Sequence, residues 1–250
     1  MKVQLIRHGT LLLSFKNKRI LVDPMLSAAG TMAAIPDVKN TSNNPLVELP
    51  INPHTLENVD GIIITHTHRD HFDDAAAELL PKNVLVLCQP EDAEKIRAKG
   101  FLQVHPVEDF CVWNKIVFYR TKGQHGHGEI GQKMGPVSGF VIRSKDEPSL
   151  YITGDTIWCS EVEEALELYH PQVIVSFAGA AQFNSGNPIT MTSQDIYQVC
   201  KKAPYGKVIA VHMEAWNHCG LSRKALNDFI KKEALSEQVY VPEDGEWMDF

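Results

Sequence analysis

Short apolar runs alternate with amphipathic stretches along most of the chain, and the two patterns predict strands and helices in turn. Apolar runs that are rich in β-branched residues predict strands, beginning with residues 1–7. Further strands are expected at 11–15, 19–22, 61–65, 84–87, 112–119, 137–143, 150–153, 172–176 and 207–211. Stretches with helical spacing follow at 75–80, 91–99, 160–169, 192–202 and 222–230.

Polar residues at the helix starts act as capping signals. Asp73 or Asp74 can cap the first helix, and Ser160 with Glu163 forms the pattern of a capping box. Ser222 is expected to cap the last helix. The core face of that helix would be formed by Ala225, Leu226, Phe229 and Ile230.

This order of elements predicts an α/β fold in which two β-sheets pack face to face with helices on both outer faces. We expect one αββα domain that spans residues 1–250. The segment 25–53 has no clear period, is rich in Pro, Asn, Ala and Gly, and is too long for a plain connection. It is predicted to be a lid or substrate loop, and 179–190 is a second loop of this kind.

The composition of the chain disfavours some classes of binding partner. Hydrophobic residues make up 44% and charged residues 22%, as in ordinary globular proteins, and no apolar run is long enough to span a bilayer. The N-terminus lacks the pattern of a secretory signal.

The five cysteines are scattered and odd in number, which favours a reduced, cytoplasmic protein. A net charge of -7 without a basic stripe disfavours nucleic acid and leaves a small-molecule substrate as the expected partner.

The candidate chemistry begins directly after the buried strand at 61–65, with the sequence His-Thr-His-Arg-Asp-His. If the chain stays extended there, His66 and His68 point to the same side and can share one metal ion. Asp70 and His71 then fall at the turn into the next helix and can face a second ion. Imidazole and carboxylate groups are expected ligands of zinc, iron or manganese.

A single quartet leaves two ions under-coordinated, and other strand ends offer further ligands. His125 and His127 follow the strand that ends near 119, Asp155 follows the strand at 150–153, and His212 follows the strand at 207–211. Each has a plain alternative. Asp155 could be a turn aspartate and His212 a core histidine, and either His125 or His127 could be the ligand.

These residues resemble the motif of the metallo-β-lactamase fold superfamily: H-x-H-x-D-H, a later His, an Asp in T-G-D-T and a final His. The resemblance extends from Val22-Asp23-Pro24 to His212, over nearly the whole chain. Leu21-Val22-Asp23-Pro24, Gln124-His125 and Gly154-Asp155-Thr156 are similar to the branch that contains ascorbate-6-phosphate lactonase and N-acylphosphatidylethanolamine phospholipase D.

The resemblance implies an αββα sandwich with a site for two divalent metal ions at one edge of the sheets. Zinc is the first expectation, with manganese or iron as alternatives. The roles that it implies are His66, His68 and His125 on the first ion, Asp70, His71 and His212 on the second, and Asp155 as the bridge. Asp23 would orient the ligating imidazoles by hydrogen bonding, although a turn role is the alternative.

The activity implied by this ligand set is hydrolysis. Two cations lower the pKa of a shared water, and the hydroxide attacks the carbonyl or phosphorus of a small ester, lactone or phosphodiester, anionic or not. Asp70 and Asp155 are the expected catalytic carboxylates, and Asp70 could pass a proton to the leaving group. Two alternatives are a non-catalytic metal-binding sensor or scaffold, and a nuclease or phosphodiesterase acting on small nucleotides.

Several residues near loops or strand ends are candidates for the substrate pocket, each with an ordinary surface role as the alternative. The polar candidates are His8, His127, Asn184 and His218. The aromatic candidates, for which core packing is the alternative, are Trp158, Phe183 and Trp216. The oligomeric state is left open by the sequence.

Overall fold

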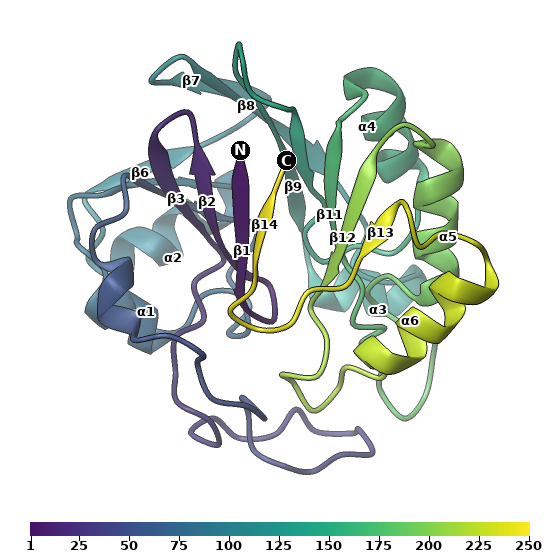
Figure 1. Cartoon of the computed structure of the whole chain (residues 1–250). Helices are drawn as coiled ribbons and strands as arrows, with labels where there is room; N and C mark the ends of the chain where they lie inside the picture. Colours follow the sequence, from purple (N-terminus) through teal and green to yellow (C-terminus); the bar gives the residue numbers. More distant parts are fainter.

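The computed structural model describes residues 1–250 and contains two seven-stranded β-sheets (Figure 1). The first sheet has the order β14 (Trp247–Asp249), β1 (Lys2–Arg7), β2 (Thr10–Phe15), β3 (Lys18–Val22), β4 (Gly61–Ile64), β5 (Leu85–Cys88) and β6 (Gln103–Pro106). The second has the order β13 (Val239–Tyr240), β12 (Lys207–Val211), β11 (Val173–Phe177), β10 (Leu150–Ile152), β9 (Ser138–Arg143), β8 (Ile116–Lys122) and β7 (Phe110–Trp113).

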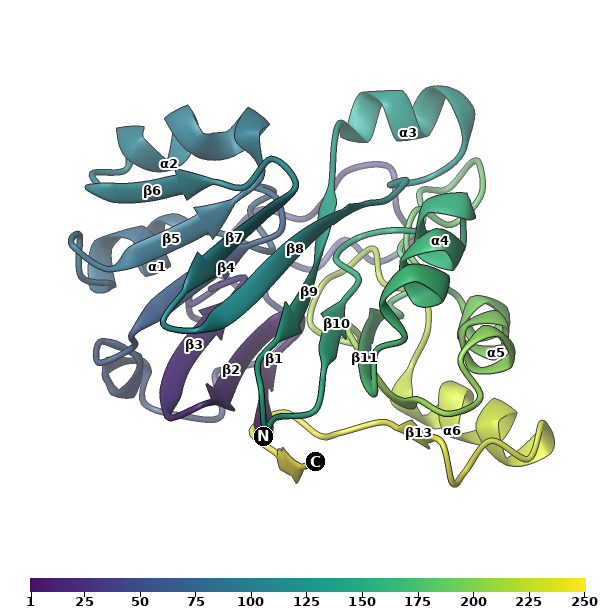
Figure 2. The same ribbon diagram turned by 90° about the horizontal axis from the view of Figure 1, so that it is seen from above.

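Helices cover the outer faces of both sheets, as Figure 2 shows. The first sheet carries α1 (Asp74–Leu79) and α2 (Ala93–Ala98), and the second carries α4 (Ser160–Tyr169), α5 (Ser193–Lys202) and α6 (Arg223–Lys232). A further helix, α3 (Gly128–Met134), follows β8, and 3₁₀ turns occupy Pro53–Leu56 and Pro90–Asp92. None of the helices combines the length and the apolar character that crossing a bilayer requires.

Three apolar clusters hold these layers together. The largest contains 22 buried residues and lies between the sheets, with Leu13 from β2 and Phe140 from β9 among its members. A cluster of 18 residues packs α1 and α2 on the first sheet, and another of 18 packs α4, α5 and α6 on the second. The predicted αββα sandwich is therefore confirmed.

The strand directions bring several strand ends to one edge. In the first sheet β1 is antiparallel to β2, which is antiparallel to β3, and β3 runs parallel to β4. In the second, β8 and β10 are each antiparallel to β9, and β10, β11 and β12 are parallel. The carboxyl ends of β1 and β4, and those of β8, β10 and β12, thus lie at the same edge of their respective sheets.

Some local predictions were wrong. The strand predicted at 112–119 is a hairpin of β7 and β8, because Asn114 and Lys115 both adopt positive φ values, 50° and 65°, and form a tight turn. The capping box at Ser160 does not form: Cys159 is the N-cap, and the Ser160 hydroxyl donates to Glu161 instead.

The other caps agree with the sequence. Asp73 accepts a hydrogen bond from the amide of Ala76 at the start of α1, and Ser222 accepts one from Ala225 in α6. On α6 the buried apolar residues are Leu226 and Ile230, whereas Ala225 is exposed and Phe229 half-buried, so that predicted face is too wide. Four further elements, β6, β13, β14 and α3, were not predicted from the sequence.

We predict that Leu13→Ala lowers the free energy of unfolding by about 3 kcal/mol, because it opens a cavity between the sheets. Leu13 is 0% exposed, whereas Leu102 is 78% exposed and provides a matched control. Leu102→Ala should change stability by less than about 0.5 kcal/mol. Urea unfolding at equilibrium measures both, and equal effects of the two substitutions would contradict this description of the core.

Candidate metal centre

Five strands end at the same edge of the two sheets, and the residues that follow them supply a cluster of histidines and aspartates. His8 follows β1, the quartet His66, His68, Asp70 and His71 follows β4, and single donors follow β8, β10 and β12. These single donors are His125, Asp155 and His212. The structure therefore brings together the seven residues of the expected ligand set, with His125 and not its alternative His127, and it adds His8 to them.

The first group of donors consists of His66, His68 and His125, whose ligand atoms all lie within 4.8 Å of one another. Nε2 of His66 is 2.9 Å from Nδ1 of His68. His66 and His125 are buried and His68 is partly exposed, so this group lies at the solvent side of the centre. His127 belongs to no donor group; it is exposed and occupies the N-cap of α3.

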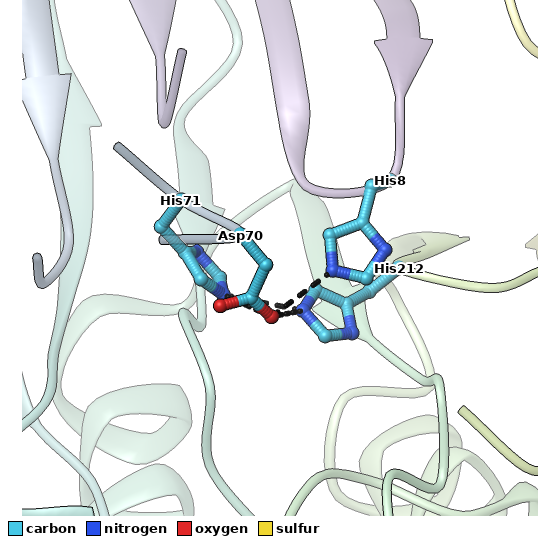
Figure 3. A group of neighbouring side chains, drawn as sticks. All are labelled: His8, Asp70, His71 and His212. Carbon is cyan, nitrogen blue, oxygen red and sulfur yellow. Dashed lines mark hydrogen bonds and ion pairs between the residues drawn. The ribbon is translucent and has the colours of Figure 1, made fainter. Parts of the chain in front are cut away.

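The second group consists of His8, Asp70, His71 and His212, which point toward one another in Figure 3. Nε2 of His212 lies 3.2 Å from Nε2 of His71, and both atoms are 3.7 Å from Oδ2 of Asp70. Nε2 of His8 lies 3.3 Å from the same oxygen. All four side chains are buried.

Asp155 lies between the two groups and forms a third, overlapping group with one histidine from each, His66 and His71. Its Oδ2 is 3.4 Å from Nε2 of His125 in the first group and 3.2 Å from Nε2 of His71 in the second. Its Oδ1 is 3.1 Å from Nε2 of His212. One carboxylate thus contacts both groups of donors.

Hydrogen bonds fix the orientation of three imidazoles. Nδ1 of His71 donates to Asp23, and Nδ1 of His125 donates to the carbonyl of Ile189. The Thr65 hydroxyl donates to Asp23 and therefore accepts from Nδ1 of His66, 3.1 Å away. In each ring Nε2 is the nitrogen that points into the centre.

Asp92 is a positioning residue that the sequence analysis missed. Its carboxylate accepts hydrogen bonds from the amide and the hydroxyl of Thr67, which stands between His66 and His68. It also accepts from Gln89 and Lys95. Asp92 therefore fixes the backbone between two donors, and its place before α2 in the sequence indicated only a helix start.

Charges within the centre are strongly coupled. Burial opposes ionisation of Asp70 and Asp155, yet neighbouring histidines hold the pKa of each carboxyl well below 3.8. Burial likewise opposes protonation of His71, but Asp155, Asp70 and Asp23 raise its pKa well above 6.5. The carboxylates thus favour a positive charge at the position of the His71 ring, which lies between them.

The other imidazoles of the second group are neutral at physiological pH. Burial lowers the pKa of His8 to about 4 and that of His212 well below 6.5. Burial has the same effect on His66 in the first group. Neutral imidazoles beside ionised carboxylates are the ligand forms that zinc and related ions require.

Several nitrogen and oxygen atoms of the centre lie close together, with fewer N–H hydrogens than are needed to form hydrogen bonds to all of their lone pairs. Two ring nitrogens, of His71 and His212, approach to 3.2 Å. Oδ1 of Asp155 is buried and makes no hydrogen bond, although Nε2 of His212 is only 3.1 Å away. A cation satisfies such lone pairs, so the residues of this centre fit divalent metal ions.

The residues predicted to line a pocket lie in different surroundings. His8 is buried inside the second donor group, and His218 is 9% exposed with Nδ1 unpartnered. Asn184 is exposed and donates to Asp37. Among the aromatic candidates, Trp216 is fully buried and Trp158 packs on the core of the second sheet, whereas Phe183 lines a cavity.

That cavity has a volume of about 410 Å³ and lies between the two long loops. Its lining includes Lys39, Asn40, Phe183, Asn184, His218 and Cys219. Asn217 anchors the segment 25–53 beside it, since its amide donates to the carbonyls of Ile35 and Asn40 and accepts from Asn44. The lid role of this segment stays a prediction.

The family is established by comparison with known proteins. A model of the beta-lactamase superfamily domain matches residues 18–213, which include every donor except His8. The chain belongs to the beta-lactamase superfamily. The superfamily predicted from the motif is thus confirmed, whereas the narrower branch resemblance stays a prediction.

Two relatives from the UPF0173 family cover nearly the whole chain, and the name of the second refers to a metal. The UPF0173 protein YddR of Bacillus subtilis is 41% identical over 254 residues and covers 100% of both chains. A UPF0173 metal-dependent hydrolase of Methanocaldococcus jannaschii is 26% identical over 93% of this chain and 94% of its own.

Two solved structures of the superfamily align over almost the entire chain. An isothiocyanate hydrolase from Delia radicum gut bacteria has a TM-score of 0.95 and 34% identity, covering 100% of this chain and 99% of its own. A possible metal-dependent hydrolase from Veillonella parvula has a TM-score of 0.96 and 35% identity, covering 99% and 98%.

We predict that Asp92→Asn lowers the free energy of unfolding at pH 7 by about 1–3 kcal/mol, because the new amide group faces the donors of Thr67 and Gln89. Burial opposes ionisation of Asp92, but hydrogen bonds from Lys95, Thr67 and Gln89 lower its pKa below 3.8. Its contribution is therefore complete above about pH 4 and is lost as the pH falls through the folded-state value.

The difference between wild type and Asp92→Asn should accordingly shrink below about pH 4, as measured by urea unfolding across a pH series. Asp109→Asn, at an exposed position, is the matched control and should leave stability unchanged at every pH. An Asp92→Asn variant as stable as wild type at pH 7 would show that Asp92 does not hold Thr67.

Proposed function

We propose that the chain is a hydrolase whose site binds two divalent metal ions, with zinc as the first expectation and manganese or iron as alternatives. The observation that carries this proposal is the convergence of donors from separate strand ends into two groups that share Asp155. The names of its relatives, metal-dependent hydrolases in the same superfamily, support it.

The proposed ligands follow the two groups. His66, His68 and His125 would hold the first ion, Asp70, His71 and His212 the second, and Asp155 would bridge them. Asp23 would fix the His71 ring through the hydrogen bond at Nδ1. Two ions bound there would supply Lewis-acid chemistry and lower the pKa of a shared water toward neutrality, so that hydroxide becomes available as the nucleophile.

The protein's own groups would orient the reactants and move protons. The contacts of Asp70 with His8, His71 and His212 all run through Oδ2, which leaves Oδ1 to accept a proton from water and pass it to the leaving group. The cavity beside His218 would hold the remainder of a small substrate, with Lys39 as the one cationic side chain among its lining residues.

The proposed substrates are small esters, lactones or phosphodiesters, whose carbonyl carbon or phosphorus accepts the hydroxide. A second candidate is an isothiocyanate, favoured by 34% identity over the full chain to the isothiocyanate hydrolase. Hydroxide would add to its central carbon while the nitrogen takes a proton, and the thiocarbamate would then split into an amine and carbonyl sulfide. The cavity is small and mostly uncharged, which suits an isothiocyanate as well.

We predict that the purified protein binds two divalent ions per chain, because the donors form two groups. Metal analysis by mass spectrometry after dialysis at defined free zinc measures the stoichiometry. His66→Ala should lose one ion, whereas His54→Ala, which removes an exposed histidine outside both groups, should keep two. A correctly folded wild-type protein that takes up no ion would overturn the proposed function.

We predict that Asp70→Ala lowers kcat by about 10²–10⁴-fold, because a proton-transfer group is lost from the centre. The assay uses a panel of esters, lactones, phosphodiesters and isothiocyanates with added zinc or manganese. Asp109→Ala is the exposed control. Folded wild-type protein that binds two ions but cleaves no member of the panel, or any small nucleotide, would favour a sensor or scaffold instead.

A further inference from the structure

His8 lies outside the quartet and outside the region that the family model matches. It occupies the turn between β1 and β2, its side chain is fully buried, and no hydrogen-bond partner reaches its Nδ1. Its Nε2 points at Oδ2 of Asp70 and belongs with Asp70, His71 and His212 to one group of potential ligand atoms (Figure 3).

The spacing of this group is close to that of donor atoms around one metal ion. Four donors at about 2.1 Å from a zinc ion lie roughly 3.4 Å from one another. Nε2 of His8 is 3.3 Å from Asp70, and Nε2 of His71 is 3.2 Å from Nε2 of His212. Asp70 lies 3.7 Å from His71 and from His212. These four separations are those of ligands around one ion.

The backbone holds His8 in this place. Its φ is 61°, and that of His212 is 73°, a conformation that costs non-glycine residues on the order of 1 kcal/mol each. The amide of His212 donates to the carbonyl of His8 at 2.9 Å, and the two ring centroids are 3.6 Å apart. The turn at His8 in the first sheet is thus joined directly to the end of β12 in the second.

Gly9 makes this approach feasible. A Cβ atom at this position would come within 3.0 Å of the Phe177 ring and within 3.5 Å of the His212 ring. The glycine therefore lets the turn sit against the second sheet, so that the preceding residue reaches the donor group.

We infer that His8 is a direct ligand of the second metal ion, in addition to Asp70, His71, His212 and the shared Asp155. This inference rests on the proposed function, since it presupposes a metal centre. It makes the two ions unequal: counting Asp155 for both, the second ion has five protein donors and the first has four. The first ion therefore retains the more open coordination, as a substrate-binding ion requires.

The competing role for His8 is that of a hydrogen-bond donor that only orients Asp70. His8→Gln separates the two roles, because a glutamine amide can reach as far as Nε2 and donate to Asp70 but does not replace imidazole as a zinc ligand. We expect His8→Gln to bind one ion as tightly as wild type and the other at least about tenfold more weakly. Zinc titration and metal analysis of the folded variant measure this.

His127→Gln is the matched control, since it removes an exposed histidine that belongs to no donor group, and it should keep two tight ions. If His8→Gln also keeps both ions at wild-type affinity while His8→Ala loses one, His8 orients Asp70 and the inference is overturned. A wild-type protein that binds no ion would instead reject the proposed function itself.

A measurement on the wild type covers the case in which the His8 variants do not fold. Nitrogen-15 spectra of the zinc-loaded protein distinguish metal-bound imidazole nitrogens from free ones. We expect six metal-bound histidines among the eleven: His8, His66, His68, His71, His125 and His212. Five bound rings, with that of His8 free, would overturn the inference while leaving the two-ion centre intact.

Discussion

The carboxylates of Asp70 and Asp155 lie inside the protein, where an uncompensated charge is costly, and the surrounding structure has to supply positive charge beside them. Their ion-pair partners are all histidines, drawn from β1, β4, β8 and β12. A histidine readily gives up its charge near neutral pH, so imidazoles alone balance two carboxylates poorly. Divalent cations balance them well and also accept the ring lone pairs. The demand for cations therefore explains the composition of this edge.

Much of the framework could be predicted from the sequence because the core strands are short apolar runs bounded by polar turns. The strand predicted at 207–211 matches β12 residue for residue, and the helix predicted at 192–202 begins one residue later, at Ser193, with Thr192 as its cap. Turn geometry was harder to predict, since Asn114-Lys115 forms a hairpin without a glycine. The strands at the sheet margins were missed because their exposed faces, such as Gln103 and His105 in β6, weaken the apolar pattern.

The donors could be identified for a related reason: each follows an apolar strand, and parallel strands end at a common edge. His8 satisfies the same rule after β1, yet it lacks a spaced partner in the sequence and was considered only as a pocket residue. Asp92 and Asn217 could not be found in this way, because they act on Thr67 and on the segment 25–53 across long stretches of chain. Only the folded arrangement shows these contacts.

The candidate metal donors are divided between the two layers of the sandwich. His8 and the quartet belong to the first sheet, whereas His125, Asp155 and His212 belong to the second. An ion held by both sets is a cross-link between sheets that are far apart in the sequence. Since the two sets converge only in the folded chain, such an ion would bind the folded chain more tightly than the unfolded one, and an increase in its free concentration would shift the folding equilibrium toward the native state. Chelating agents would thus act on this protein as denaturants, even where no substrate is turned over.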